Sequence, residues 1–334
     1  MDLPTVWFVA IAVLWTGYLV LEGFDFGVGM LLPSVGRDES GRRVMINSIG
    51  PVWDGNEVWL ITAIGAMFAA FPAWYAATLS GFYLPVLLII LALVSRGVAF
   101  EYRGKGDSAV WRRRWDVAIV AGSAVPAFGW GLVFANMLRG VELGADGVVT
   151  SSLLDLLSPY ALLGGLATTS LFVLHGALFL GLKTDGPVRH RARAAARRSA
   201  FAALPAVVGF LVWTARDQAT GVVSVVVVAS VGVGTALLAA VALAARRREG
   251  WAFAATALAV GGVAVAVFGS LYPALLPSLT SAAFDLTVAN SASAPYTLGV
   301  LSVIGAVFLP LVVAYQSWSY WVFRRRVGPL EVGS

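Results

Sequence analysis

The chain has 334 residues, of which 59% are hydrophobic and only 12% are charged. Soluble domains carry about 25% charged residues, so this composition excludes a soluble protein and predicts an all-α polytopic membrane protein. The chain has no cysteine, which excludes disulfides, zinc thiolate sites and cysteine-ligated iron–sulfur clusters.

Nine segments are apolar enough to cross a bilayer, which takes about 20 residues in a helix. The first segment follows no basic region and is too long for the apolar core of a signal peptide, so we expect it to be retained. The predicted membrane helices are 5–31, 52–70, 76–102, 113–138, 156–182, 197–214, 221–245, 251–272 and 295–323.

Basic residues lie in the loops after the first, third, fifth and seventh predicted helices and at the C-terminus. Since positively charged loops stay in the cytoplasm, the N-terminus is predicted outside and the C-terminus in the cytoplasm of a bacterium. The net charge of +5 then reflects topology and contact with anionic lipid, not nucleic acid. The loop 273–294 is expected to lie over the outer surface.

The first predicted helix contains two acidic residues, Glu22 and Asp25. An ionised carboxylate in hydrocarbon costs about 3 kcal/mol on insertion scales, so such groups mark function. They are three residues apart and share one side of the helix, about 12 and 8 Å below the cytoplasmic face. Gly23, Gly27 and Gly29 allow another helix to approach them closely.

The second predicted helix begins at Gly50-Pro51 and has Asp54 in its first turn, where the helix dipole favours a carboxylate. Glu57 follows one turn deeper. Trp53 stands beside Asp54, where it is able either to stack on a quinone ring or to anchor the helix, and the sequence leaves both open.

The third and fourth predicted helices place further charges near the same face. Arg96 lies about 9 Å deep, at the depth of Asp25, so we expect it to pair with a buried carboxylate. Glu101 lies at the boundary and Asp116 in the first turn of the next helix. For these two, capping or pairing with basic loops is as plausible as function. The pattern as a whole predicts proton or cation handling.

The chain has two histidines. His190 lies in a basic loop and is expected to be solvated. His175 lies within the fifth predicted helix, where a hydrogen bond between helices is favoured over a haem ligand. A haem held by two histidines cannot be built from membrane segments here, so we predict neither a redox centre nor a metal site in this chain.

A short internal similarity joins VLEGFDFGVG (20–29) to VLHGALFLGL (173–182). A repeat of the first four helices as the next four, with 295–323 extra, suits two four-helix bundles. The corresponding units are 1–138, which carries the acidic motifs, 139–272, and 273–334 with the outer loop, the last helix and a basic cytoplasmic tail.

Four segments resemble subunit II of the cytochrome bd quinol oxidases. They are LEGFDFGVGM (21–30), RRVMINSIGPVWDGNEVWLITAIGAMFAAFP (42–72), YAATLSGFYLP (75–85) and SRGVAFEYR (95–103). The resemblance implies nine helices in two four-helix bundles plus one peripheral helix. It also implies a heterodimer with subunit I, which holds haems b and d and oxidises quinol. Small accessory subunits are further expected partners, and menaquinone or ubiquinone is the expected substrate of the complex.

The resemblance further implies that this subunit supports assembly and contributes a cytoplasmic proton path for the reduction of dioxygen to water. Trp53 matches a position that packs a structural quinone in some members. Glu22 is not carried over from the family, because this position need not be acidic in relatives. The residues predicted for the proton path are Asp54, Asp25, Arg96, Asp116, Glu57 and Glu101.

Two other functions fit the same residues. A proton-coupled secondary transporter would also have acids within the membrane, close helix packing and an internal repeat. A scaffold without chemistry would use the acids only to join helices.

Overall fold

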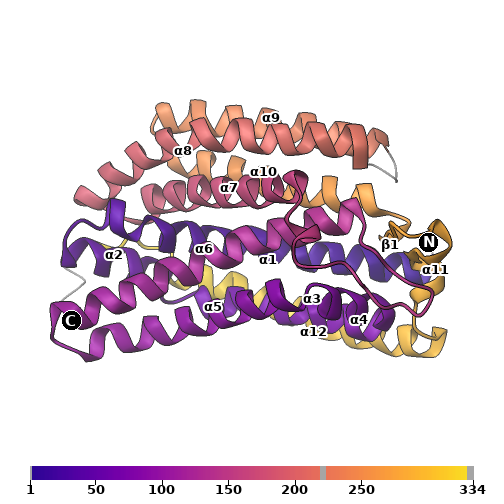
Figure 1. Cartoon of the computed structure of the whole chain (residues 1–334). Helices are drawn as coiled ribbons and strands as arrows, with labels where there is room; N and C mark the ends of the chain where they lie inside the picture. The colour runs from indigo at the N-terminus through magenta and orange to yellow at the C-terminus, as the bar shows by residue number, and fades with distance from the viewer. Residues whose placement is uncertain (1, 219–222, 329–334) are drawn as a thin grey trace.

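The computed structural model describes residues 2–218 and 223–328, and its long helices run along one common direction (Figure 1). The α-helices are α1 Leu3–Val35, α2 Glu39–Ile49, α3 Trp53–Ala70, α4 Pro72–Gly81, α5 Tyr83–Tyr102, α6 Ala109–Arg139, α7 Pro159–Lys183, α8 Gly186–Trp213, α9 Val223–Ala245, α10 Glu249–Leu271, α11 Val288–Ser291 and α12 Pro295–Val322. A two-stranded antiparallel sheet joins β1 Ala274–Leu276 to β2 Leu286–Thr287.

Within the described residues, eight helices are long and apolar enough to cross a membrane. The predicted helix 52–70 corresponds to α3, which is not among the eight. Its 18 residues rise about 27 Å, slightly less than the roughly 30 Å hydrocarbon core, and two carboxylates stand in its first turns. The polytopic all-α class is therefore confirmed, whereas the count of nine spans stays a prediction.

Three larger differences separate the structure from the predicted helices. The segment after the first span, expected as a loop, contains the helix α2, whose N-terminus is capped by the Asp38 side chain accepting from the Gly41 N–H at 2.6 Å. The predicted helix 76–102 is divided at Phe82 into α4 and α5, because Pro85 has no N–H to continue the hydrogen bonding. The helix α8 begins 11 residues before the predicted start at 197, since the arginine-rich segment is itself helical.

Two predicted segments lie partly outside the described residues. The first two residues of the predicted helix 221–245 lie outside the described residues, and so does the end of the basic tail, 329–334.

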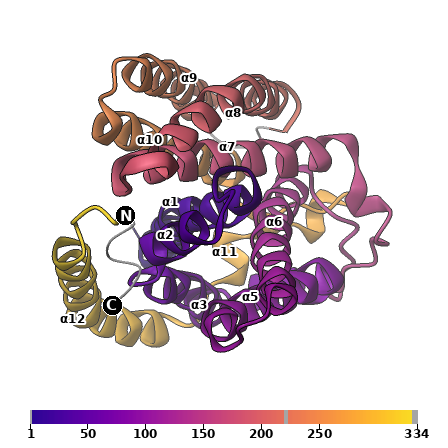
Figure 2. The same cartoon turned by 90° about the vertical axis from the view of Figure 1, so that its left-hand side faces the viewer.

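The helix α1 runs through the centre of the molecule and packs against α3, α6, α7 and α10. Seen along the helices, α7, α8, α9 and α10 lie on one side of α1, and α3, α5 and α6 lie on the other (Figure 2). The helices α1 and α7 touch at Gly27 and Gly176, where a Cβ on Gly27 would stand 2.8 Å from the Gly176 Cα. Only glycine permits this approach.

Ion pairs gather the basic segments at one end of the helices, the end at which α2 lies (Figure 1). The pairs join α2 and the residue before it to the turn after α5, the start of α6 and the start of α8, and they also join α8 to the start of α10 and the C-terminal segment to the residue before α8. The pairs are Arg42–Asp116, Arg103–Glu39, Arg191–Asp38, Arg193–Glu249 and Arg326–Asp185.

The segment between α10 and α12 lies at the opposite end, beside the N-terminus (Figure 1). It contains β1, β2 and α11 and is tied to the ends of other helices by backbone hydrogen bonds. The Leu279 N–H donates to the Val141 carbonyl at 2.8 Å, and the Ser293 N–H donates to the Ala70 carbonyl at 2.9 Å. This segment covers the end that carries few basic residues.

Candidate functional site

Charged side chains from three helices meet in the interior between α1, α3 and α5. Glu22 and Arg96 have no exposed surface, and Arg96 Nη1 donates to Glu22 Oε1. Glu57 Oε1 lies 3.7 Å from the same nitrogen, and 23% of the Glu57 side chain is exposed. Glu57 thus connects the interior with the surface. We name Glu22, Asp25, Asn56, Glu57 and Arg96 the buried cluster.

Apolar packing holds Arg96 in this position. The guanidinium carbon lies 4.9 Å from the ring centre of Phe26 and 5.3 Å from that of Phe100, distances at which aromatic faces attract a cation. The helix α6 comes close at Gly122, where a Cβ would lie 2.6 Å from the Arg96 Cβ. These contacts leave the guanidinium little freedom to leave its carboxylate partners.

Asp25 joins the cluster through an amide. It is fully buried, and its Oδ2 accepts a hydrogen bond from Asn56 Nδ2 at 2.7 Å. Its Oδ1 is buried without a partner among the described residues, as is Glu22 Oε2. Each carboxyl group therefore has one oxygen held by the protein and one able to carry a proton.

The charges in the buried cluster do not balance. If all three carboxyl groups were ionised, one guanidinium would face three negative charges in a low-dielectric site, where unpaired charge is costly. A proton held among the carboxyl groups reduces that excess, and such groups titrate together as one unit. The arrangement suits a group that stores and passes on a proton.

A second set of charges lies nearer the basic end, and we name it the end cluster: Glu39, Arg42, Arg103, Arg112 and Asp116. Asp116 accepts from Arg103 Nε at 2.6 Å and from Arg42 Nη1 at 2.8 Å. Arg103 also pairs with Glu39 at 2.9 Å, and these hydrogen bonds from its guanidinium lower the pKa of the Glu39 carboxyl.

The two clusters are stacked along the same helix pair. Arg96 lies on α5 and Arg103 in the helical turn that directly follows it (Arg103–Lys105). The two residues are seven positions apart, which places them on one side at a separation of about 10 Å along the helix axis. Asp116 and Gly122 lie at corresponding levels of α6. The end cluster therefore stands between the buried cluster and the basic end of the molecule.

The structure brings together Glu22, Asp25, Glu57 and Arg96 of the residues singled out in the sequence. Arg96 pairs with a carboxylate as predicted, but its partner is Glu22, which the sequence ranks below Asp25. Asp116 belongs to the end cluster.

The remaining predicted positions lie at or near the surface. Asp54 and Glu101 are exposed. Trp53 is half-buried with its ring 5.2 Å from that of Phe100, so it packs on α5 next to the face that carries Arg96.

Sequence reasoning missed the polar residues that complete the site. Asn56 is fully buried, and its Oδ1 accepts from Gln316 Nε2 at 2.9 Å and from the Tyr320 hydroxyl at 2.8 Å. Polar side chains within apolar helices were the available signal. The pairing of α3 with α12 across about 260 residues carries no local signature.

His175 is held by hydrogen bonds between helices, as the sequence favours. Its Nδ1 is 2.7 Å from the Thr256 hydroxyl, and its Nε2 is 3.2 Å from the Val20 carbonyl. The ring stacks on Phe253 at 4.5 Å. Both ring nitrogens are occupied, so this histidine does not fit a haem iron. Within the described residues, no cluster of three His, Asp or Glu side chains is placed to hold a metal ion.

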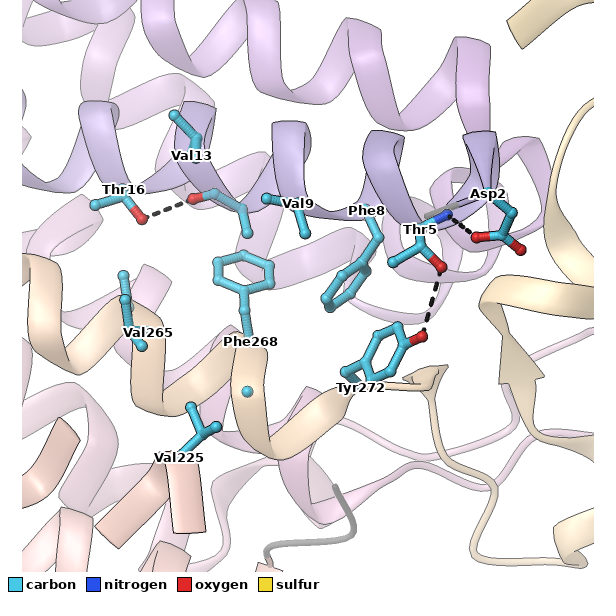
Figure 3. A pocket seen from close by; sticks show the side chains of 13 residues that line it. Asp2, Thr5, Phe8, Val9, Val13, Thr16, Val225, Val265, Phe268 and Tyr272 are labelled. Atoms are coloured by element: carbon cyan, nitrogen blue, oxygen red, sulfur yellow. Dashed lines mark hydrogen bonds between the residues drawn. The ribbon is translucent and has the colours of Figure 1, made fainter. Parts of the chain in front are cut away.

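A groove of about 650 Å³ lies at the other end of the molecule, between α1, α9 and α10. Figure 3 shows its apolar wall, which includes Phe8 and Phe268, and the hydroxyl pair of Thr5 and Tyr272 at 3.4 Å. Asp2 at its mouth accepts from the Thr5 N–H. The described residues that line it carry no buried charge, so this groove suits apolar chains and not proton chemistry.

Comparison with known proteins agrees with these features. The sequence profile of the family described as cytochrome bd terminal oxidase subunit II matches residues 3–323. The cytochrome bd ubiquinol oxidase subunit 2 of Bacillus subtilis is 41% identical over 332 residues, which cover 99% of this chain and 98% of the relative. The cytochrome bd-I ubiquinol oxidase subunit 2 of Escherichia coli K12 is 34% identical over 357 residues, covering 96% and 94% of the two chains.

The fold is also similar to one seen in a solved structure. A chain of the bd oxidase from Geobacillus thermodenitrificans superimposes with a TM-score of 0.78 at 21% sequence identity, over 96% of this chain and 99% of that chain. At this identity, the similarity establishes the arrangement of the helices.

Proposed function

The chain belongs to the family of cytochrome bd terminal oxidase subunits II, and from this premise we propose that it carries protons from the basic end of its helices towards a partner subunit. It is part of a terminal quinol oxidase complex. The observation that supports the proton path is the buried cluster, in which the fully buried Arg96 faces Glu22 while Glu57 reaches the surface.

The path begins at Asp54, an exposed carboxylate in the first turn of α3. Glu57 follows three residues later on the same side of the helix and lies 3.7 Å from Arg96 Nη1. Glu22 and Asp25 are the deeper carboxyl groups. Arginine remains protonated in proteins, so Arg96 holds the carboxyl groups together electrostatically while the proton moves among them.

The end cluster and the nearby surface complete the entrance. Asp116, fixed by Arg103 and Arg42, holds α2, α5 and α6 together around the mouth of the path. Glu101 adds an exposed carboxylate to the same surface. Trp53, half-buried beside Asp54, is the proposed contact for a quinone ring or a lipid.

The proposed topology has nine membrane helices, with the N-terminus outside and the C-terminus in the cytoplasm of a bacterial cell. It groups residues 1–138 and 139–272 as two four-helix bundles, followed by 273–334. The ion pairs that link the basic loops at one end support this orientation.

The main partner in this proposal is subunit I, which holds haems b and d and whose assembly this chain supports. Small accessory subunits are further partners. Quinol, either menaquinol or ubiquinol, is the reductant of the complex. Dioxygen is reduced to water at the haems, and the residues of this chain deliver protons for that reaction. A proton-coupled transporter has no comparable support, because the family match extends over residues 3–323.

The proton path is tested by removing single carboxyl groups from the complex. We expect Asp25→Asn to lower quinol-dependent oxygen consumption about tenfold or more, since a positioned acid–base group contributes that much or more to a rate. Asp54→Asn should give a smaller loss, because other surface carboxylates replace an exposed one. Purified complexes in liposomes are compared by oxygen uptake and by proton uptake from the cytoplasmic side.

Haem absorbance of each complex separates the two proposed roles. A variant that keeps the haem content of the unchanged complex but turns over slowly has lost proton delivery. A variant that has lost haem has failed to assemble. The control is Glu142→Gln, an exposed carboxylate near the opposite end, which should leave both unchanged. Parent-like oxygen consumption in Asp25→Asn would rule out the path.

A further inference from the structure

The helix α12 buries few of its side chains against the rest of the chain, and polar contacts join it to other helices near both of its ends. Of its 28 residues only Leu298 is buried, and much of its apolar surface is open. Near one end, Trp7 Nε1 donates to Ser302 Oγ at 3.1 Å. Near the other end, Gln316 and Tyr320 both donate to Asn56 of α3. The second contact leads directly to Asp25.

The Trp59 indole determines which group donates and which accepts in every hydrogen bond of this second contact. Trp59 Nε1, which is able only to donate, lies 3.2 Å from the Gln316 side chain. The Gln316 oxygen must therefore face Trp59, and its NH₂ group must face Asn56. The Asn56 oxygen then faces α12, where it also receives the Tyr320 hydroxyl proton.

This orientation determines what Asp25 meets. With its oxygen turned to α12, Asn56 presents its NH₂ group to Asp25 Oδ2 at 2.7 Å and to the Leu21 carbonyl at 3.4 Å. A donor at Oδ2 favours the ionised carboxylate and leaves Oδ1, which has no partner among the described residues, as the oxygen that takes a proton.

We propose that Gln316 and Tyr320 of α12 are positioning residues that, with Trp59 and through Asn56, set the proton affinity of Asp25. The inference rests on the proposed proton path. The other charged or titratable groups that face Asp25 are Glu22 on α1, Glu57 on α3, Arg96 on α5 and Tyr320 itself. A change of Gln316 or Tyr320 that leaves Glu22, Glu57 and Arg96 in place therefore reports on the orientation of the Asn56 amide.

The test removes both donors from the Asn56 oxygen in the full oxidase complex with the double variant Gln316→Leu/Tyr320→Phe. The amide is then free to turn its NH₂ group away from Asp25. We expect the pH profile of quinol-dependent oxygen consumption to move towards alkaline values by about one unit, the effect of one hydrogen bond to a carboxylate. Haem content should match the parent's.

Matched changes on the same helix serve as controls. Tyr315→Phe removes a hydroxyl from a side chain that is 68% exposed, and Ser317→Ala removes one that bonds only within its own helix. Neither should move the profile. Tyr320→Phe alone should give a smaller shift in the same direction, and it decides the question if the double variant does not assemble.

Two outcomes contradict different claims. A pH profile like the parent's in the variants of Gln316 and Tyr320, while Asp25→Asn impairs turnover, overturns this inference and leaves the proton path standing. Parent-like turnover in Asp25→Asn overturns the proton path itself. An infrared carboxyl band that is absent in Asp25→Asn and shifted in the double variant would support the inference independently.

Discussion

Arg96 shows how a single buried charge organises its surroundings. Its guanidinium has no exposed surface, pairs with Glu22 and lies between two aromatic rings. Depth along the helices allows the sequence to predict that Arg96 pairs with a buried acid. It does not identify which acid, because the rotation of α5 relative to α1 depends on packing at Gly122 and on the rings of Phe26 and Phe100.

Removing one partner of this pair should be far more damaging than removing both. Arg96→Gln leaves buried carboxylates uncompensated, and breaking a buried pair costs about 3–5 kcal/mol. We expect low yield and a lower temperature of thermal inactivation for the complex, partly restored in the double variant Glu22→Gln/Arg96→Gln.

The measurement is the thermal inactivation midpoint of oxygen consumption, with haem absorbance as the check on assembly. Arg113→Gln, on an exposed position of α6, controls for the loss of a positive charge alone. If the double variant is no more stable than Arg96→Gln, Glu22 is not the group that depends on this arginine.

Among the elements, the close packing of α1 against α7 requires residues without side chains at the point of contact. A Cβ on Gly27 would also fall against the Phe172 carbonyl oxygen, and one on Gly176 would lie 2.6 Å from the Gly27 Cα. These atoms belong to the backbone and have little room to move.

We therefore expect Gly27→Ala and Gly176→Ala to lower the stability of the chain by about 1–3 kcal/mol or more, the cost of overpacking a filled interior. The comparison variants are Gly65→Ala and Gly299→Ala, where a Cβ has nothing within 4 Å. Because alanine favours helix over glycine by about 1 kcal/mol, these should be neutral or stabilising. Thermal inactivation of the four variants distinguishes the sites, and equal effects would mean that the helix contact is not tight.

The sequence predicts the long helices well, since an apolar run of this length in a membrane must satisfy its backbone hydrogen bonds internally and therefore forms a helix. It misses α2 because an 11-residue polar helix has no apolar run, although Asp38 followed by Glu39 is a recognisable start signal. It also misses the contact of Asn56 with α12, which depends on tertiary packing between distant segments.

At the scale of the molecule, the basic end is tied together by ion pairs between segments from the whole chain. The Glu39 carboxyl has its pKa lowered by the Arg103 guanidinium. An acid with a lowered pKa adds stability that is complete above its ordinary value of about 4.3 and is lost as the pH falls through the lowered value.

Acidification should therefore affect the parent more than Glu39→Gln. We expect the difference in stability between the two proteins to shrink as the pH falls below about 4.3 and through the lowered pKa of Glu39. The change should be less than about 1 kcal/mol, because 39% of the Glu39 side chain is exposed and solvent screens the pair. Thermal unfolding at a series of pH values measures this difference. Glu142→Gln is the control, and parallel curves for parent and Glu39→Gln would contradict the prediction.

The way α12 is attached has a consequence for handling the protein outside its membrane. Lipid tails give helices no hydrophobic reason to associate, so a helix with so little buried surface relies on its hydrogen bonds to Trp7, Trp59 and Asn56. Those bonds face no competitor in hydrocarbon, but water that enters a detergent micelle offers alternative partners. Mild extraction that retains native lipid around α12 should therefore preserve the hydrogen bonds from α12 to Asn56, and with them the environment of Asp25, which harsh solubilisation changes.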